Sequence, residues 1–223
     1  NYGVFASCEN LQTVQIEEGV QRVTGNGVFE NCSNLENISI PSTLTEFKKN
    51  PFEGTKWLEL RQQENPLVIV NGTLLDGTKC TGDVVIPDTV TTIAGGAFKK
   101  GNLESVTISG TVNTIGSKAF SNCKKLKQVI LSKGVTQIGA NAFDGCKYLN
   151  KVIIGSGVTT IESEAFANCD RISQIIARPT KAPEIIKSNA FTSDSYNFTE
   201  LLVNYGYKNH YSKELYWRNF KNI

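Results

Sequence analysis

The sequence contains no methionine, and His210 is the only histidine among its 223 residues. Metal and cofactor chemistry that relies on several histidines is therefore excluded. The chain also lacks a phosphate-binding loop of the Gly-x-x-x-x-Gly-Lys type and the Cys-x-x-Cys pairs typical of zinc sites. We therefore expect no enzymatic activity, no cofactor and no metal.

Long hydrophobic runs and a charge excess of either sign are missing as well. No stretch of about 18 apolar residues occurs, so we expect no membrane-spanning helix. Lys and Arg number 23 against 21 Asp and Glu. A nucleic-acid-binding protein typically has a large positive excess, so we expect no nucleic-acid partner. Because the chain lacks an initiator Met and starts within a repeated motif, we expect a fragment, with any signal peptide or anchor outside it.

One repeated unit accounts for most of the sequence. It reads Phe-x-x-Cys-x-x-Leu-x-x-Val-x-Ile, then Val-x-x-Ile and Ala-Phe, most clearly between Phe120 and Phe166. Successive marker phenylalanines are 22 to 25 residues apart, except for one gap of 46 in which a copy has lost its Phe. This period predicts a solenoid whose stacked copies bury a shared core. The markers are Phe5, Phe29, Phe52, Phe98, Phe120, Phe143, Phe166 and Phe191.

Within one unit, the alternation of side chains predicts a short strand. Val129 and Leu131 are two residues apart and face the core, whereas Ile130 faces the opposite side. β-branched residues and short runs favour strand over helix. After a turn, Val135 and Ile138 return to the core. We therefore expect a β-rich repeat solenoid with units of about 23 residues and a parallel strand column along one face.

Five of the six cysteines follow the same period, each three residues after a marker Phe. Stacked copies would place them in a column at roughly the 4.8 Å strand spacing, which is in principle within disulfide reach. We expect free thiols buried in the core, as is common for cysteine. Cys80 is out of phase and is the expected reactive thiol. The in-phase residues are Cys8, Cys32, Cys123, Cys146 and Cys169.

These motifs resemble the BspA-like leucine-rich repeats, a treponemal-type class with Ala-Phe and Cys at fixed places. The resemblance covers nearly the whole chain and implies a right-handed horseshoe with the strand column on its concave face. It also implies a bacterial (or protist) protein, at the cell surface or secreted, that serves adhesion or host contact. Arg61 stands where a core Val is expected, so we expect the copy after Phe52 to depart from a regular strand.

An irregular insert over residues 55–82 interrupts the repeat. Within it, two β-prone runs flank Asn71-Gly72, which predicts a hairpin over residues 67–75. Two roles are open for this hairpin. It is either a protruding contact element or a packed repair of the solenoid.

The C-terminal stretch changes character. Tyr207, Tyr211 and Leu215 recur at a spacing of four, which predicts a short helix with one apolar face. We expect residues 1–203 to form the solenoid and residues 204–223 to form a cap over its last open core. Sugar stacking by the aromatic residues is the alternative.

The outward side of the strand column is the expected binding surface. Ile130, Ile153 and Ile176 are consecutive in phase, and solvent-facing aliphatic rows can mark a binding patch. The alternative is that such neighbours only stabilise the sheet through cross-strand pairs. We expect Ile153 to be exposed enough for Ile153→Asp to leave folding intact. The predicted partner-binding residues are Gln128, Ile130, Lys151, Ile153, Gln174 and Ile176.

Positive charge is concentrated in one segment. Residues 118–151 contain seven lysines and one acid, Asp144. This segment is suited to an acidic partner, or it simply keeps the surface solvated. We therefore predict a binding or adhesion module for an extracellular protein or polysaccharide, with an acidic partner favoured by the charge. The alternative is a structural spacer within a larger surface protein.

Overall fold

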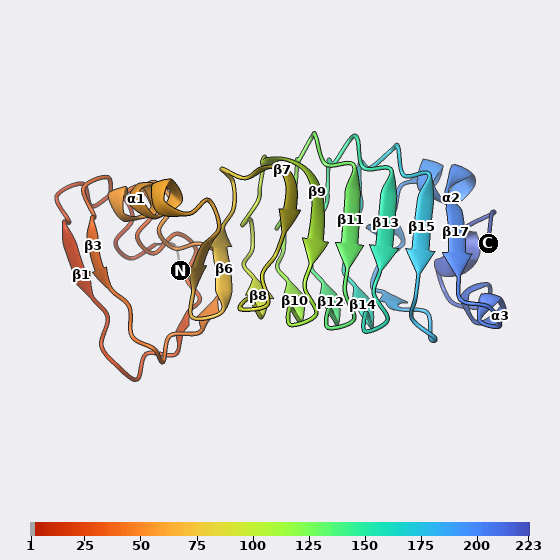
Figure 1. The fold of residues 1–223 in the computed structure, drawn as a ribbon, viewed down its shortest axis with the longest axis horizontal. Helices are drawn as coiled ribbons and strands as arrows, with labels where there is room; N and C mark the ends of the chain where they lie inside the picture. Colours follow the sequence, from red (N-terminus) through yellow and green to blue (C-terminus); the bar gives the residue numbers. More distant parts are fainter. Residues whose placement is uncertain (1–2) are drawn as a thin grey trace.

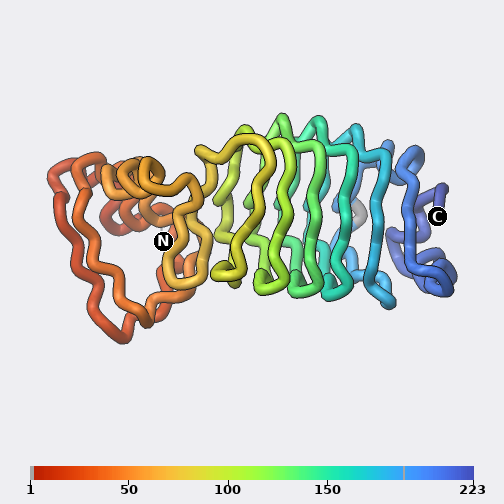
Figure 2. Tube along the Cα trace, in the orientation of Figure 1, coloured from red at the N-terminus to blue at the C-terminus, as the bar shows by residue number. Residues whose placement is uncertain are grey.

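The computed structural model describes residues 3–223, which form a β-solenoid of about eight coils stacked along one axis (Figure 1). Each regular coil contributes a strand to one column, then a two-residue strand to a second column, and then the turn with its marker Phe. The chain trace advances coil by coil from one end of the stack to the other (Figure 2). The predicted repeat solenoid with a parallel strand column is confirmed.

The first column is a six-stranded parallel sheet in the order β17-β15-β13-β11-β9-β7. Because one repeat makes one coil, equivalent residues stand opposite one another: Val129 pairs with Val152, and Val152 with Ile175. All three are fully buried, as the alternation predicts. The strands are β7 (Thr81–Val85), β9 (Asn102–Ile108), β11 (Gln128–Leu131), β13 (Lys151–Ile154), β15 (Gln174–Ala177) and β17 (Glu200–Val203).

A second column of parallel strands, which the sequence did not predict, follows the first around each coil. Its regular members are two residues long and end on a buried isoleucine, such as Ile138. Runs this short show no periodicity in a sequence. The prediction that Val135 and Ile138 return to the core is confirmed. The members are β8 (Thr92–Ile93), β10 (Thr114–Ile115), β12 (Gln137–Ile138), β14 (Thr160–Ile161) and β16 (Glu184–Ile185).

The named strands of the N-terminal coils pair only with each other, and a single parallel bridge, Lys49 with Gly95, joins these coils to the C-terminal coils. β1 (Thr13–Gln15) lies parallel to β3 (Asn37–Ser39), and β2 (Arg22–Val23) lies parallel to β4 (Glu46–Phe47). These pairs form two separate two-stranded sheets. The strand columns of the N-terminal coils are therefore not continuous with those of the C-terminal coils.

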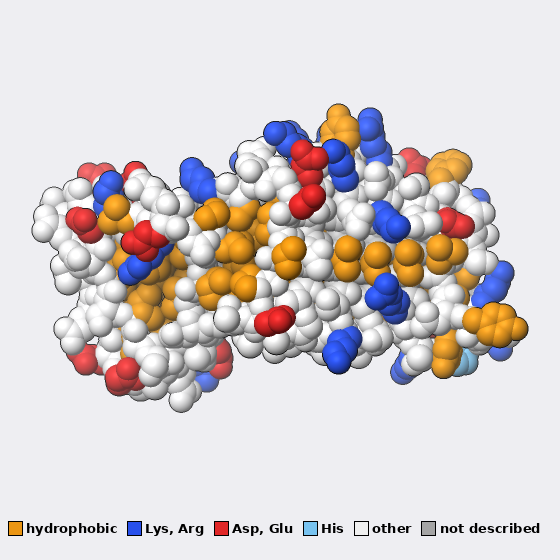
Figure 3. Space-filling model, in the orientation of Figure 1, with side chains coloured by type: hydrophobic (Ala, Val, Ile, Leu, Met, Phe, Trp, Pro, Cys, Tyr) orange, Lys and Arg blue, Asp and Glu red, His pale blue; other side chains and the backbone are white. Residues whose placement is uncertain are grey.

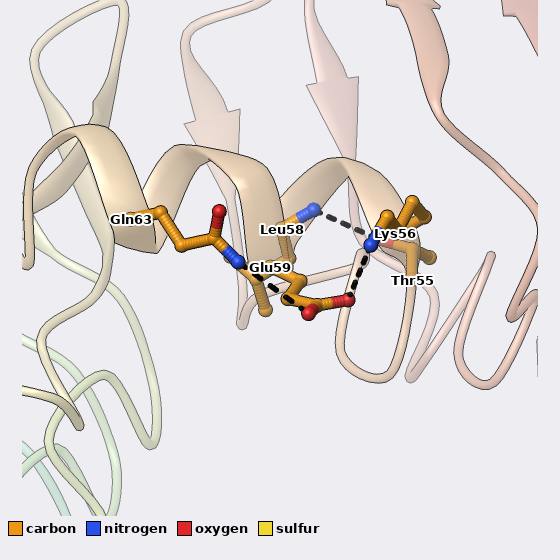
Figure 4. Close-up of polar contacts among 5 residues, drawn as sticks. All are labelled: Thr55, Lys56, Leu58, Glu59 and Gln63. Atoms are coloured by element: carbon orange, nitrogen blue, oxygen red, sulfur yellow. Dashed lines mark hydrogen bonds and ion pairs between the residues drawn. The ribbon is translucent and has the colours of Figure 1, made fainter.

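Helix α1 (Lys56–Glu64) stands where the irregular copy was expected. A helix was not predicted, although the segment has no β-branched residue and is rich in good helix formers. The Thr55 hydroxyl caps the helix by accepting a hydrogen bond from the Leu58 N–H at 3.2 Å. The Lys56 ammonium lies 3.1 Å from the Glu59 carboxylate one turn later (Figure 4).

The hairpin predicted over 67–75 is present as two antiparallel strands, β5 (Val68–Val70) and β6 (Thr73–Asp76). Asn71 and Gly72 connect them with φ angles of 45° and 79°. Positive φ at both central residues is the requirement of a tight type I′ turn. All four residues of β6 are buried, so the hairpin is packed into the solenoid and is not a protruding element.

Strand β6 also separates two hydrophobic cores. Leu74 packs into the core of the C-terminal coils and Leu75 into the core of the N-terminal coils. Alternate side chains of a strand face opposite sides, so a single strand can serve both cores. We call these the C-terminal core and the N-terminal core.

Gly77 occupies the marker position of the coil that lacks a Phe. Its N–H donates to the Ala97 carbonyl at 2.8 Å, just as the N–H of Phe98, Phe120, Phe143 and Phe166 each donates to the Ala that precedes the next marker. A Cβ atom at Gly77 would overlap the Phe98 ring. The marker rings therefore form two separate stacks, one from Phe5 to Phe52 and one from Phe98 to Phe191.

Four of the five in-phase cysteines are buried, and Cys8, in the first coil of the stack, is exposed. Cys80 was expected to be reactive, but it is 6% exposed and belongs to the C-terminal core. Burial raises the pKa of its thiol to about 11, so that expectation is wrong. Each buried in-phase thiol donates to the carbonyl of the marker Phe in the preceding coil, at 2.9 to 3.1 Å. The donors are Cys32, Cys123, Cys146 and Cys169.

Aromatic residues of the C-terminal segment close the last coil. Tyr211 and Trp217 are fully buried, and the Trp217 indole N–H donates to the Pro183 carbonyl at 2.6 Å. Helix α3 (Lys208–Tyr211) is a single turn, so Leu215 lies beyond it and is 56% exposed. The prediction that Leu215 shares a helical apolar face is therefore wrong. The other short helices are η1 (Ser188–Ala190), α2 (Ser193–Phe198) and η2 (Trp217–Asn219).

Candidate binding surface on the strand column

Two rows of outward-facing side chains cross the C-terminal strands. The aliphatic row consists of Ile130, Ile153, Ile176 and Leu202, which stand opposite one another on β11, β13, β15 and β17. The polar row, two residues earlier on the same strands, consists of Gln128, Lys151, Gln174 and Glu200. The structure therefore brings all six predicted site residues together on one face.

The exposure of the aliphatic row differs along its length. None of its members belongs to either core. Leu202 at the end is 40% exposed, and Ile130 and Ile176 are half-buried. Ile153 is only 9% exposed, so the prediction that it is solvent-exposed is wrong. Strands lie about 4.8 Å apart, and the branched neighbours on both sides cover the side chain between them.

Charged and polar groups border the aliphatic row. Figure 3 shows a line of hydrophobic side chains on the C-terminal strands, with Lys or Arg side chains on both sides of it. In the polar row, the Gln174 amide donates to the Glu200 carboxylate at 2.9 Å. The Lys127 ammonium lies 2.6 Å from the Glu104 carboxylate, and this contact raises the pKa of Lys127. The surface thus has an apolar centre and a polar rim, a common layout of protein interfaces.

A second gathering of hydrophobic side chains was not predicted from the sequence. Figure 3 shows it over the hairpin, between the N-terminal strands and β7. Leu67, Ile69 and Val70 of this region are only partly buried, although they pack against the two cores. The signal for it, a run of four apolar residues at Leu67 to Val70, was interpreted only as a hairpin strand.

The side chains that could ligate a metal ion are dispersed in the part of the chain that the structure describes. Among residues 3–223, no set of three or more His, Cys, Asp and Glu side chains lies close enough to hold a metal ion. His210 is exposed in the C-terminal segment, where its Nδ1 atom lies 3.3 Å from the Thr180 carbonyl. Within the same described range, no helix has both the length and the apolar character to cross a membrane.

Comparison with known proteins relates the repeat to a described family. The family model of the BspA type leucine-rich repeat region matches residues 1–79 and 68–199, in six copies. No curated protein matches the chain. Among solved structures, a leucine-rich cell surface protein from Faecalibacterium prausnitzii is 25% identical with a TM-score of 0.58, over 93% of this chain and 64% of that one.

Two further solved structures show weaker similarity. A leucine-rich repeat protein from Bacteroides ovatus is 23% identical with a TM-score of 0.43, over 90% of this chain and 42% of that one. A leucine-rich repeat protein from T. pallidum is 26% identical with a TM-score of 0.35, over 77% and 69% of the two chains. The present chain therefore spans less than two thirds of the Faecalibacterium and Bacteroides proteins.

Proposed function

Because the chain belongs to the BspA-type leucine-rich repeat family, we propose that it is a non-enzymatic binding module that recognises an extracellular protein through the strand face of its C-terminal coils. The aliphatic row and the polar row form the contact surface. The module acts outside the cell, at the surface of a bacterium or in secreted form. The similar Faecalibacterium protein, described as a cell surface protein, supports this location.

The observation that carries the proposal is the register of the aliphatic row. Four aliphatic side chains on four neighbouring strands form one straight apolar strip outside both cores. Burying such a strip contributes roughly 25 cal/mol per Å² of apolar surface, before the cost of association. Aliphatic side chains suit the apolar groups of a protein, whereas the hydroxyl groups of a sugar find no hydrogen-bond partner on an aliphatic strip. A protein partner is therefore favoured over a glycan at this face.

The charges favour an acidic partner. Lys124, Lys125 and Lys147 are exposed in the turns that precede β11 and β13, and Lys151 is half-buried within the polar row. None of these four ammonium groups forms an ion pair with any residue between 3 and 223. Unpaired lysines beside an apolar strip speed the encounter with an acidic protein surface.

Binding of the whole chain to a panel of purified extracellular-matrix proteins, measured by surface plasmon resonance, tests this function. For any protein that binds, Ile176→Asp should weaken the affinity by about tenfold or more, because it places a charge in the apolar strip. The matched control is Ser39→Asp, which adds the same charge at the equivalent outward position of β3. The control should bind like the unaltered chain.

Two outcomes would contradict the proposal. Equal affinities of Ile176→Asp and Ser39→Asp would place the contact elsewhere. Failure of every matrix protein to bind would favour the structural spacer. The close packing around Ile153 favours that alternative, since it indicates a stabilising role for the row. Thermal melting of each variant distinguishes lost binding from lost folding.

A further inference from the structure

A polar pocket of about 610 Å³ lies on the marker-Phe turns, where the N-terminal coils meet the C-terminal coils. Residues of both regions line it, and every lining residue is either polar or glycine. Its size lies within the range of about 300 to 1,000 Å³ typical of small-ligand sites. The pocket shares no residue with the aliphatic or the polar row. It is lined by five lysines, Lys48, Lys49, Lys99, Lys100 and Lys118.

Four of these lysines are exceptions to the repeat. Lys49 stands three residues before Phe52, and Lys118 stands two residues before Phe120. Lys99 and Lys100 directly follow Phe98. In every other coil with a marker Phe, these four positions hold a residue without positive charge. At these four repeat positions, a positive charge therefore occurs only in the coils that surround the pocket.

Two of the lysines also adopt a backbone conformation that favours other residues. Lys100 and Lys118 have φ angles of 62° and 60°. The equivalent left-handed positions elsewhere are mostly filled by Gly or Asn, such as Asn122 and Asn141, which tolerate positive φ. Strained residues that gather at one place point to a function there.

Asn50 adds an unsatisfied buried polar group to the lining of the pocket. It lines the pocket and is 7% exposed, and its Oδ1 atom accepts a hydrogen bond from the Phe52 N–H at 3.0 Å. Its Nδ2 group has no hydrogen-bond partner among residues 3–223. A buried donor without a partner destabilises a fold, so this part of the lining is not optimised for stability.

The acidic groups of the pocket do not neutralise the lysines. Asp76 accepts hydrogen bonds from Gln62 and from Thr78, and Glu30 lies 3.5 Å from Lys49. Glu53 is the third acid in the lining. The other four lysines form no ion pair with any residue that the structure describes. The pocket therefore keeps a positive excess that suits an anionic ligand.

We propose that this pocket binds an acidic saccharide. Its carboxylate or sulfate lies among Lys99, Lys100 and Lys118. Hydroxyl groups of the sugar find further partners in the polar lining, whereas an apolar peptide side chain finds none. A single inorganic anion is too small to fill a pocket of about 610 Å³. The site is separate from the protein-binding face.

Isothermal titration calorimetry at low ionic strength tests the proposal with four probes. These are a heparin tetrasaccharide, an oligogalacturonate of similar length, a neutral galacto-oligosaccharide and inorganic phosphate. We expect the sulfated or the carboxylated probe to bind, and the stronger of the two identifies the acidic group. The neutral sugar should not bind, and phosphate should bind at least about tenfold more weakly than the acidic sugar.

Substitutions then locate the site. The double variant Lys100→Asn and Lys118→Asn installs the residue that suits positive φ, so the fold should be retained while saccharide affinity falls by about tenfold or more. The matched control, Lys124→Asn with Lys125→Asn, removes two exposed lysines that do not line the pocket. It should bind within about twofold of the unaltered chain.

A third variant, Asn50→Asp, keeps the acceptor for the Phe52 N–H but adds a negative charge to the lining of the pocket, so it should also weaken the binding of an acidic saccharide. Three results would overturn the proposal: no acidic saccharide binds, phosphate binds as tightly as the saccharides, or the two double variants lose affinity equally. Ile176→Asp should bind the saccharide normally, which separates this proposal from the one on the strand face.

Discussion

The N-terminal and C-terminal coils are built from the same repeat but differ in how far it continues. In the C-terminal coils, five marker rings stack at 4.7 to 5.1 Å, beside a six-stranded sheet. In the N-terminal coils, three rings stack at 5.5 and 5.8 Å, beside two-stranded sheets. In a solenoid each coil is stabilised mainly by its neighbours. Continuity of the stack, more than the motif itself, therefore determines how tightly a coil packs.

The junction explains why the two regions remain separate. Gly77 offers no ring to continue the stack, and the Phe98 ring fills the space beside it. Strand β6 turns one leucine toward each core. The loss of one marker Phe thus divides the core and creates the surfaces that the regular coils lack. One of those surfaces is the lysine-lined pocket.

The largest effect is expected from removing a ring inside the longer stack. Phe143 is fully buried between Phe120 and Phe166, so Phe143→Ala should lower the free energy of unfolding by about 3–5 kcal/mol. Phe5 is 46% exposed at the end of the shorter stack, so Phe5→Ala should cost about 1 kcal/mol or less. Urea unfolding of both variants measures the difference, and similar losses would show that the two stacks are equivalent.

Substitutions in β6 should affect one region each. Leu74→Ala and Leu75→Ala each leave a cavity in a different core, at a cost of about 2–5 kcal/mol. Hydrogen exchange followed by mass spectrometry should show faster exchange in residues 84–120 for Leu74→Ala and in residues 29–58 for Leu75→Ala. If both variants accelerate exchange in both segments, the chain has one core, not two.

A smaller effect is expected on the outward face of the sheets. Ile153→Asp places a carboxylate between two isoleucines at a site that is 9% exposed, so it should destabilise the fold by about 1–3 kcal/mol. Ser39→Asp, at the equivalent exposed position of the N-terminal coils, should change stability by less than about 0.5 kcal/mol. Equal melting temperatures for the two variants would show that Ile153 is not enclosed by its neighbours.

Thiol reactivity compares Cys8, at the N-terminal end of the solenoid, with Cys80 in the C-terminal core, and it requires no substitution. Cys8 is exposed, whereas burial holds the pKa of Cys80 at about 11 and keeps it a protonated thiol near neutral pH. A maleimide reagent at pH 7.5 should therefore modify one cysteine per native chain. Peptide mapping should identify it as Cys8. Rapid modification of Cys80 or of the buried cysteine column would contradict the packing described above.

The repeat period predicted the features that recur in every coil. The in-phase position of Ile130 placed the first strand column, and Asn71-Gly72 placed the hairpin, because each depends on local alternation or turn chemistry. The enclosure of Ile153 depends on the neighbouring strands, and the burial of Cys80 depends on the C-terminal core around it. Contacts between side chains of neighbouring coils cannot be predicted from the alternation of residues within one strand.

The lysine pocket shows the same limit. Its residues come from five successive turns and are far apart in the sequence, so only stacking brings Lys49, Lys100 and Lys118 together. The available sign was an interruption of the repeat, namely Lys at positions where the other coils with a marker Phe have no positively charged residue. The helix α1 was missed for a related reason. Arg61 indicated only a departure from a regular strand, whereas the signals for a helix were the capping residue Thr55 and the absence of β-branched residues after it.

The two tryptophans allow the most direct test of the division into two cores, because Trp57 belongs to the N-terminal core and Trp217 to the C-terminal core. The variant Trp217→Phe leaves Trp57 as the only reporter, and Trp57→Phe leaves Trp217. In each variant the reporter therefore lies in the region that was not changed. Urea titration of both should give a lower fluorescence midpoint for Trp57 than for Trp217. Coincident midpoints would contradict the division into two cores.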